Sequence, residues 1–239
     1  MNKTPVSAAG NGQYLDISTL LKKSGGSYAR ALGIKLTKTP QLEVYKWFIA
    51  AILYGPRITE DIATHTWHEF ERNNMLTPQR MVDAGWNRLV ELLDHGGYAR
   101  YDYKTATKLR DINRALLEEY EGNLNNMHTL ALDAADLEQR VMALGKGIGK
   151  VTAAIFLREL RGKWKKANPA LSPLAITAAR KLGYLPGHIT TNRQALDHLQ
   201  HLWREHGKAA ASFPELEAAL VREGLRLRRH ANRHISHKN

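Results

Sequence analysis

The stretch of sequence that most constrains the fold is Gly145-Lys-Gly-Ile-Gly-Lys150, which lies between two segments of helical character. Gly147 and Gly149 can adopt backbone angles that are closed to other residues, so the chain can turn sharply there. Ile148 can fix this turn to the core, and Lys150 begins an apolar helix. The first N–H groups of a helix lack partners, and the helix dipole favours an anion beside them. The stretch therefore predicts a helix, a tight hairpin and a helix, with amides and lysines directed at one phosphate.

The charge of the whole chain favours the same kind of ligand. Its 239 residues carry a formal net charge of +12, which suits nucleic acid, although an acidic membrane surface or ribosomal RNA would also satisfy it. No apolar run is long enough to cross a bilayer, and no signal peptide is evident. We therefore expect a cytoplasmic, nucleoid-associated monomer that binds double-stranded DNA and has no membrane partner.

Apolar residues recur at helical spacing along most of the chain. Capping residues, prolines and glycines mark the ends of the expected helices, with Thr77 before Pro78 and Ser172 before Pro173 as the clearest starts. A turn is expected at residues 122–126. The predicted helices span residues 40–54, 58–70, 77–85, 88–94, 104–121, 136–144, 172–183, 194–206 and 213–227.

The hairpin resembles that of the helix-hairpin-helix DNA glycosylases, the superfamily of endonuclease III. The family pattern Leu-Pro-Gly-Val-Gly-x-x-Thr-Ala is matched by Gly145-Lys-Gly-Ile-Gly-Lys-Val-Thr-Ala153, in which Lys146 replaces the usual proline. The resemblance implies DNA contacts by the residues of this turn and the start of the next helix, namely Lys146, Gly147, Ile148, Gly149, Lys150 and Thr152.

The resemblance also implies a fold. It extends over residues 42–228 and predicts an all-α protein with two helical domains and the DNA site in the cleft between them. The first domain would be a six-helix barrel at residues 42–163, with the helix-hairpin-helix motif at residues 142–160. The second would be formed from both ends of the chain, residues 1–41 and 164–239.

The segment Tyr54-Gly-Pro-Arg57 occupies the place where this family often carries a glutamine that fills the gap left by a flipped base. Tyr54 and Arg57 are therefore candidate wedge residues that would contact DNA. An ordinary surface loop is the alternative for this segment.

A second loop, His95–Lys108, resembles the loop of the same superfamily that enters the minor groove. Tyrosines there can stack on bases, while cationic side chains reach phosphates. The resemblance implies DNA contacts by Tyr98, Arg100, Tyr101 and Lys104. One of the loop's three tyrosines is expected to anchor it to the core instead, and Asp102 is expected to cap the helix that follows.

Two departures from the family pattern bear on catalysis. The catalytic aspartate of the family aligns with Ser172, and the lysine nucleophile of its bifunctional members aligns with Val151. Without an amine at Val151, no Schiff base with the abasic sugar can form there, so lyase activity is not expected. Excision still needs a carboxylate beside the oxocarbenium-like sugar. The candidates are Asp102, which is the first choice, and Glu60 and Asp61 near the wedge segment.

The function that the resemblance implies is a monofunctional DNA glycosylase, which flips and excises a modified base from duplex DNA and leaves an abasic site. Small residues at Gly55 and Val151 suggest room for a bulky base, such as a sugar-modified one, so DNA repair and phage defence both stay open. The alternative is a non-catalytic helix-hairpin-helix protein that binds damaged or structured DNA, which Ser172 favours.

No cofactor is expected. The absence of cysteine excludes the iron–sulfur cluster of many relatives, while a cation at the hairpin remains compatible with the motif. No metal site is expected at His198, His201 and His206, because no carboxylate completes the set.

Overall fold

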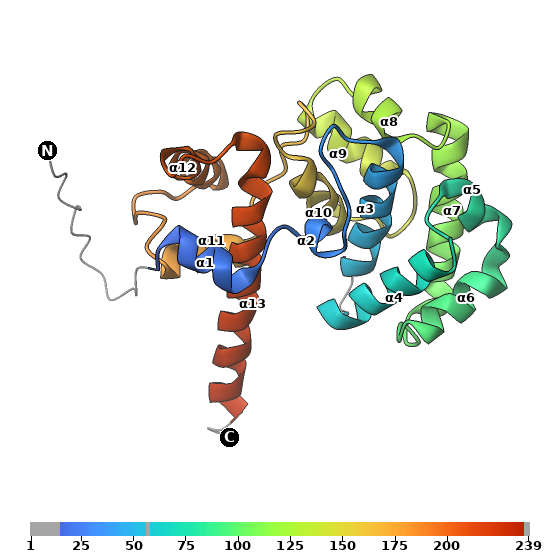
Figure 1. The fold of residues 1–239 in the computed structure, drawn as a ribbon, viewed down its shortest axis with the longest axis horizontal. Helices are drawn as coiled ribbons and strands as arrows, with labels where there is room; N and C mark the ends of the chain where they lie inside the picture. The colour runs from blue at the N-terminus through green and yellow to red at the C-terminus, as the bar shows by residue number, and fades with distance from the viewer. Residues whose placement is uncertain (1–14, 56–57, 237–239) are drawn as a thin grey trace, which may run out of the picture. The chain divides into compact units, whose positions relative to one another are not determined.

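The computed structural model describes residues 15–55 and 58–236, and these residues form an all-α fold without a strand (Figure 1). The chain divides into two compact units, Tyr28–Pro169 on the one hand and Met1–Ser27 with Ala170–Asn239 on the other. Within the described ranges, no helix is both long enough and apolar enough to cross a bilayer.

The observed division differs from the expected boundaries, which lay between residues 41 and 42 and between residues 163 and 164. The backbone N–H of Tyr28 donates to Glu159 Oε1 at 3.0 Å, which ties the residues before position 42 to the larger unit. Arg161 similarly donates to the carbonyl of Pro169 at 2.5 Å, which holds the residues after position 163. Both boundaries therefore depend on hydrogen bonds that no local sequence pattern reveals.

The larger unit is a set of helices packed around one apolar helix. Its elements are α2 (Tyr28–Ala31), α3 (Gln41–Tyr54), α4 (Glu60–Arg72), α5 (Pro78–Asp83), α6 (Gly85–His95), α7 (Asp102–Tyr120), α8 (Leu124–Leu130), α9 (Ala134–Ala143) and α10 (Lys150–Leu160). Helix α8 occupies most of the segment that was expected to be a turn. Asn123 explains the difference, because its side chain accepts the N–H of Asn125 at 3.0 Å and caps the helix.

Helix α3 is the core of this unit. Its residues are buried on every side from Tyr45 to Leu53 except at Lys46, so it needs partners all round. Trp47 donates its indole N–H to the carbonyl of Phe156 in α10 at 2.9 Å, and the ring of Phe48 meets that of Phe156 at 5.1 Å. Helix α10, which begins at the hairpin, is thereby held firmly against the centre of the unit.

The smaller unit comprises α1 (Ile17–Ser24), α11 (Pro173–Lys181), α12 (Asn192–Glu205), a 3-10 turn (Ala210–Ser212) and α13 (Phe213–Ser236). The expected cap of α11 is present, since Ser172 Oγ accepts the N–H of Ala175 at 3.2 Å. Helix α13 passes very close to α11 at Gly224, where a Cβ would lie 2.4 Å from the carbonyl oxygen of Leu174. Glycine is therefore required at this crossing for steric reasons.

Candidate functional site

The turn between α9 and α10 has the geometry of a glycine-bent hairpin. Gly147 adopts a φ of +95°, in the region that favours glycine. Ile148 is only 5% exposed, so it anchors the turn, and its N–H donates to the carbonyl of Gly145 at 3.1 Å. Gly149 does not use the freedom that glycine allows, because its φ of −99° and ψ of 179° are open to any residue.

The outer side of the hairpin is open and basic. Lys146, Gly147, Gly149 and Lys150 are exposed, and α10 begins without a capping side chain. The first amides of α10 are therefore available to an anion from outside the chain. Thr152 is an exception among the expected contact residues, because only 7% of it is exposed and its side chain is turned into the protein. A direct DNA contact by the Thr152 side chain is thus excluded in this conformation.

A lysine that the sequence reasoning missed lies under the same turn. Lys108 of α7 packs against Gly147, where a Cβ would lie 2.8 Å from Lys108 Cε and 3.3 Å from Lys108 Nζ. Burial lowers the pKa of this ammonium. Lys104, one turn earlier on α7, is exposed, and residues four apart lie on one helix face. The hairpin thus has lysines of α7 on one side and its own lysines on the other.

Replacing Lys108 with methionine is expected to raise the melting temperature at pH 7, because an apolar side chain of similar length removes the desolvated charge. The pKa of Lys108 is lower in the folded state than in the unfolded chain. At pH values between these two pKa values the unfolded chain binds more protons than the folded one, so the stability of the wild type rises with pH in that range. The advantage of the variant should therefore shrink in melts from pH 7 to pH 10.5. Lys104→Met is the control and should change the melting temperature little. If Lys108→Met lost the same amount of stability at every pH, the assignment of a desolvated charge to Lys108 would be contradicted.

The loop before α7 is anchored to the core by Tyr98, and this corrects the expectation that Tyr98 contacts DNA. The residue is fully buried, and its hydroxyl donates to the carbonyl of Leu53 at 2.9 Å. Burial accordingly raises the pKa of this phenol. Gly96 adds a second anchor, because its carbonyl accepts a hydrogen bond from the Thr66 hydroxyl of α4 at 3.1 Å.

The other residues of this loop face outward to different degrees. Arg100 is exposed and its guanidinium carbon lies 5.5 Å from the ring centroid of the half-buried Tyr101. Tyr103, which the sequence reasoning did not select as a contact, is 63% exposed and rests against Trp86 at 5.3 Å between ring centroids. Asp102 Oδ1 accepts the N–H of Tyr103 at 2.6 Å. The expectation that Asp102 caps this helix was wrong, because Asp102 is itself the first residue of α7 and the residue before it, Tyr101, makes no capping hydrogen bond with its side chain.

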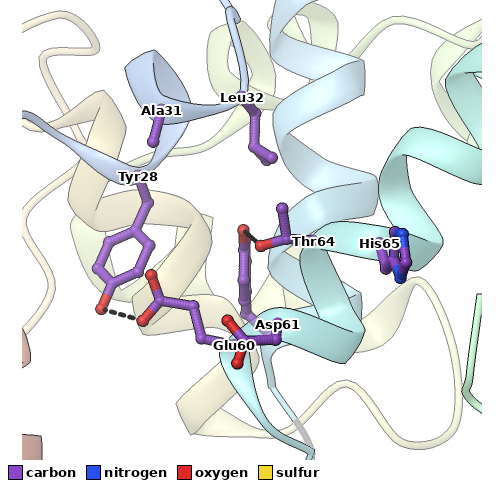
Figure 2. Close-up of a pocket in the computed structure, with 8 residues that line it drawn as sticks. Tyr28, Ala31, Leu32, Glu60, Asp61, Thr64 and His65 are labelled. Atoms are coloured by element: carbon purple, nitrogen blue, oxygen red, sulfur yellow. Dashed lines mark hydrogen bonds between the residues drawn. The ribbon is translucent and has the colours of Figure 1, made fainter.

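A pocket of about 460 Å³ opens at the start of α4. Its lining comes from α2, the end of α3 and the first turns of α4: Tyr28, Ala31, Leu32, Tyr54, Glu60, Asp61, Thr64 and His65. Figure 2 shows the carboxylates of Glu60 and Asp61 side by side at its lower rim, with Leu32 and Ala31 above. The volume lies within the usual range for small-molecule sites. Two of the three carboxylate candidates thus share one pocket, whereas Asp102 does not line it.

The two carboxylates have different surroundings. Tyr28 donates its hydroxyl to Glu60 Oε2 at 3.5 Å (Figure 2), and the guanidinium carbon of Arg158 lies 5.0 Å from the centroid of the same ring. The side chain of Asp61 makes no hydrogen bond or ion pair within residues 15–55 and 58–236. Both acids also suit the positive end of α4, which by itself accounts for acidic residues in a first turn.

Two aromatic rings, those of Tyr28 and Tyr54, also line the pocket. Tyr54 shares a hydrogen bond of 2.8 Å with Thr64 Oγ1, and its ring lies 5.6 Å from that of Tyr28. Tyr54 is therefore part of the pocket wall and not an isolated wedge. Arg57, the other wedge candidate, lies outside the described residues.

The end of α3, which carries Tyr54 of the pocket, packs against the first turn of α10 at Gly55. A Cβ at this position would lie 2.4 Å from Thr152 Oγ1, so the end of α3 approaches the first turn of α10 as closely as glycine permits. Gly55 follows directly on Tyr54 of the pocket wall. The interpretation of Gly55 as room for a bulky base was wrong, because Thr152 fills that space. Val151, by contrast, is 64% exposed beside the hairpin.

Several site residues could not have been found from local patterns. Tyr28, Leu32 and Thr64 carry no motif, and the described residues before position 40 form two short helices. Lys108 had one usable signal, since it follows Lys104 by four positions on a predicted helix. In the described ranges, no group of three or more His, Cys, Asp or Glu side chains is placed to hold a metal ion.

A scan against models of known protein families found no match for this chain, and a search of curated proteins found none either. Its function is therefore inferred from the residues of the site.

Proposed function

We propose that this protein is a monofunctional DNA glycosylase, which holds duplex DNA at the hairpin and excises a modified base received in the pocket at the start of α4. The observation that carries the proposal is the close approach of Gly55 to Thr152, where a Cβ on Gly55 would lie 2.4 Å from Thr152 Oγ1. It joins an open, basic helix start to an acidic, aromatic pocket within one unit. A nucleotide whose phosphate binds the start of α10 would have its base near the pocket.

The hairpin supplies sequence-independent binding. Exposed Lys146 and Lys150 flank the free amides of α10, and Lys108 lies beneath Gly147. Phosphate contacts of this kind position a protein on DNA without reading its sequence. A phosphate beside Lys108 would also favour the charged ammonium and so oppose the effect of burial on its pKa.

The pocket supplies the features that a flipped base requires. The half-buried ring of Tyr54 offers an apolar face for stacking, and the Thr64 hydroxyl and two carboxylates offer hydrogen bonds to a base edge. Such recognition outside the helical stack gives an enzyme access to the glycosidic bond.

The excision step follows from the two carboxylates. As the bond between C1′ and the base breaks, its electron pair leaves with the base and positive charge develops on the sugar. The free carboxylate of Asp61 stabilises that charge and takes a proton from the water that attacks C1′. Glu60, held by Tyr28, adds a fixed negative charge beside it. The products are the free base, which acquires a proton, and an abasic site.

The test is incubation of the full chain with duplexes that carry a panel of modified bases, followed by alkali. Breaks that appear only after alkali, together with release of the free base, are expected for one or more members of the panel. Breaks without alkali would contradict the monofunctional assignment, and no base release over a broad panel would reject the enzyme.

The alternative, a non-catalytic protein that binds damaged or structured DNA, is favoured by one observation. Ser172 stands where the related family carries its catalytic acid, and its hydroxyl is used to cap α11 at 3.2 Å from Ala175 N. This protein would bind such DNA tightly in the same assay and release no base.

A further inference from the structure

We infer that the C-terminal half of α13 is a second DNA-binding element, a projecting arginine helix that binds the phosphates of a duplex. Here the arginine helix means residues 227–236 of α13. The choice of duplex DNA as the polyanion rests on the proposed function, whereas the existence of the surface does not.

The arginine helix lacks the apolar face by which the rest of α13 packs against its neighbours. Upstream, Leu216, Leu220 and Glu223 are buried on one side, and Leu227 is the last apolar residue of that stripe. Helical spacing would continue the stripe at positions 230, 231 and 234, where the chain has histidine, alanine and histidine. Every residue from Arg228 to Arg233 is exposed. The helix is therefore not built to pack against an apolar protein surface.

The charge of the arginine helix is not neutralised. No acidic residue follows Glu223 in the sequence, and Glu223 itself already accepts a hydrogen bond from Arg226 at 2.8 Å. The guanidinium groups of Arg228, Arg229 and Arg233 make no hydrogen bond or ion pair in the described part of the chain. Arg226, Arg229, His230 and Arg233 follow the spacing i, i+3, i+4, i+7, which places them on one helix face.

The helix dipole does not account for this pattern. Basic residues are favoured only in the last turn, which covers Arg233 but not Arg228 or Arg229, since α13 ends at Ser236. Like charges four residues apart, as at Arg229 and Arg233, weaken an exposed helix unless an anion lies beside them. Arginine, whose planar fork binds phosphate with two hydrogen bonds, predominates here over lysine.

The dimensions suit a duplex. Ten residues of helix extend for about 15 Å, and double-stranded DNA carries one negative charge for about every 1.7 Å of its axis. The arginine helix thus passes several phosphates wherever it lies along a groove or across a strand.

The test compares the wild-type chain with Arg228→Gln/Arg229→Gln/Arg233→Gln, by anisotropy with an undamaged duplex between 50 and 300 mM salt. Three lost phosphate contacts should lower the slope of log Kd against log salt by about 2.7, and affinity at about 100 mM salt should fall at least tenfold. The control Lys181→Gln/Arg204→Gln/Lys208→Gln removes the same charge from exposed positions of the same unit. This control variant should change the slope by less than about one third of the change expected for the arginine variant.

Circular dichroism checks that the helix content is kept. An equal slope for the arginine variant and the control variant would overturn the inference. It would also be overturned if the arginine variant lost binding to anionic lipid vesicles but bound DNA as the wild type does. The two proposals can fail independently. If the protein excises a base and the arginine variant keeps the wild-type slope, only the DNA-binding role of the arginine helix is refuted. A lowered slope in a protein that excises no base would refute only the glycosylase.

Discussion

Asp61→Asn is expected to lower the single-turnover rate of base release by about 10² to 10⁴-fold, the usual contribution of a positioned acid or base. The amide keeps the size of the side chain but neither stabilises positive charge on the sugar nor accepts a proton from water. Asp61 lines the pocket and has no partner in the described part of the chain, so its charge is available to substrate. The measurement is release of base under enzyme excess, with whichever duplex the panel identifies.

Two variants make this result specific. Glu60→Gln keeps a hydrogen-bond acceptor for Tyr28, whose hydroxyl lies 3.5 Å from Glu60 Oε2, so we expect a loss of about tenfold, below the usual contribution of a catalytic acid. Asp102→Asn alters a carboxylate that lies outside the pocket and should leave the rate unchanged. Glu60 and Asp61 both lie in the first turn of α4, so Glu60→Gln and Asp61→Asn should each lower the free energy of unfolding by only about 0.3–1 kcal/mol. A large loss in Asp102→Asn with normal activity in Asp61→Asn would move the catalytic group to the start of α7.

Gly96→Ala is expected to produce the largest loss of stability, about 3 kcal/mol, or roughly 10 °C in melting temperature. A Cβ at this position would lie 2.4 Å from Thr66 Oγ1 and 2.6 Å from Thr66 Cα, so rotation of the Thr66 side chain cannot relieve the clash. Helix α4 would have to move away from the loop that Tyr98 anchors. The same movement should impair the pocket, because α4 carries Glu60 and Asp61.

The control for Gly96→Ala is Gly149→Ala in the same unit. No atom lies within 4 Å of a Cβ at Gly149, and its φ of −99° is acceptable to alanine. Thermal melts should place this variant within about 0.5 kcal/mol of wild type. If Gly96→Ala melted at the wild-type temperature, helix α4 would be free to separate from the loop, and the pocket could not be as fixed as we describe it.

The features of this protein that depend on neighbouring residues could be predicted from the sequence. Helix starts at Pro78 and Pro173 followed from Thr77 and Ser172, whose hydroxyls bind amides three residues on. The hairpin followed from Gly147 and Ile148, because a positive φ and an apolar anchor are local requirements. Glu60 and Asp61, which the sequence offered as candidate catalytic carboxylates, line the pocket, and their catalytic role stays a prediction.

Only the tertiary structure decided which side chains meet. Tyr98 was predicted from the sequence as a DNA contact and Tyr103 was not, yet Tyr98 donates to Leu53 inside the core and Tyr103 is 63% exposed. Gly55 suggested empty space, whereas Thr152, almost a hundred positions later, occupies it. Capping and turn formation are governed by a few adjacent dihedral angles, which sequence encodes directly. Burial and pocket formation depend on contacts between distant segments, and those exist only once the helices have packed.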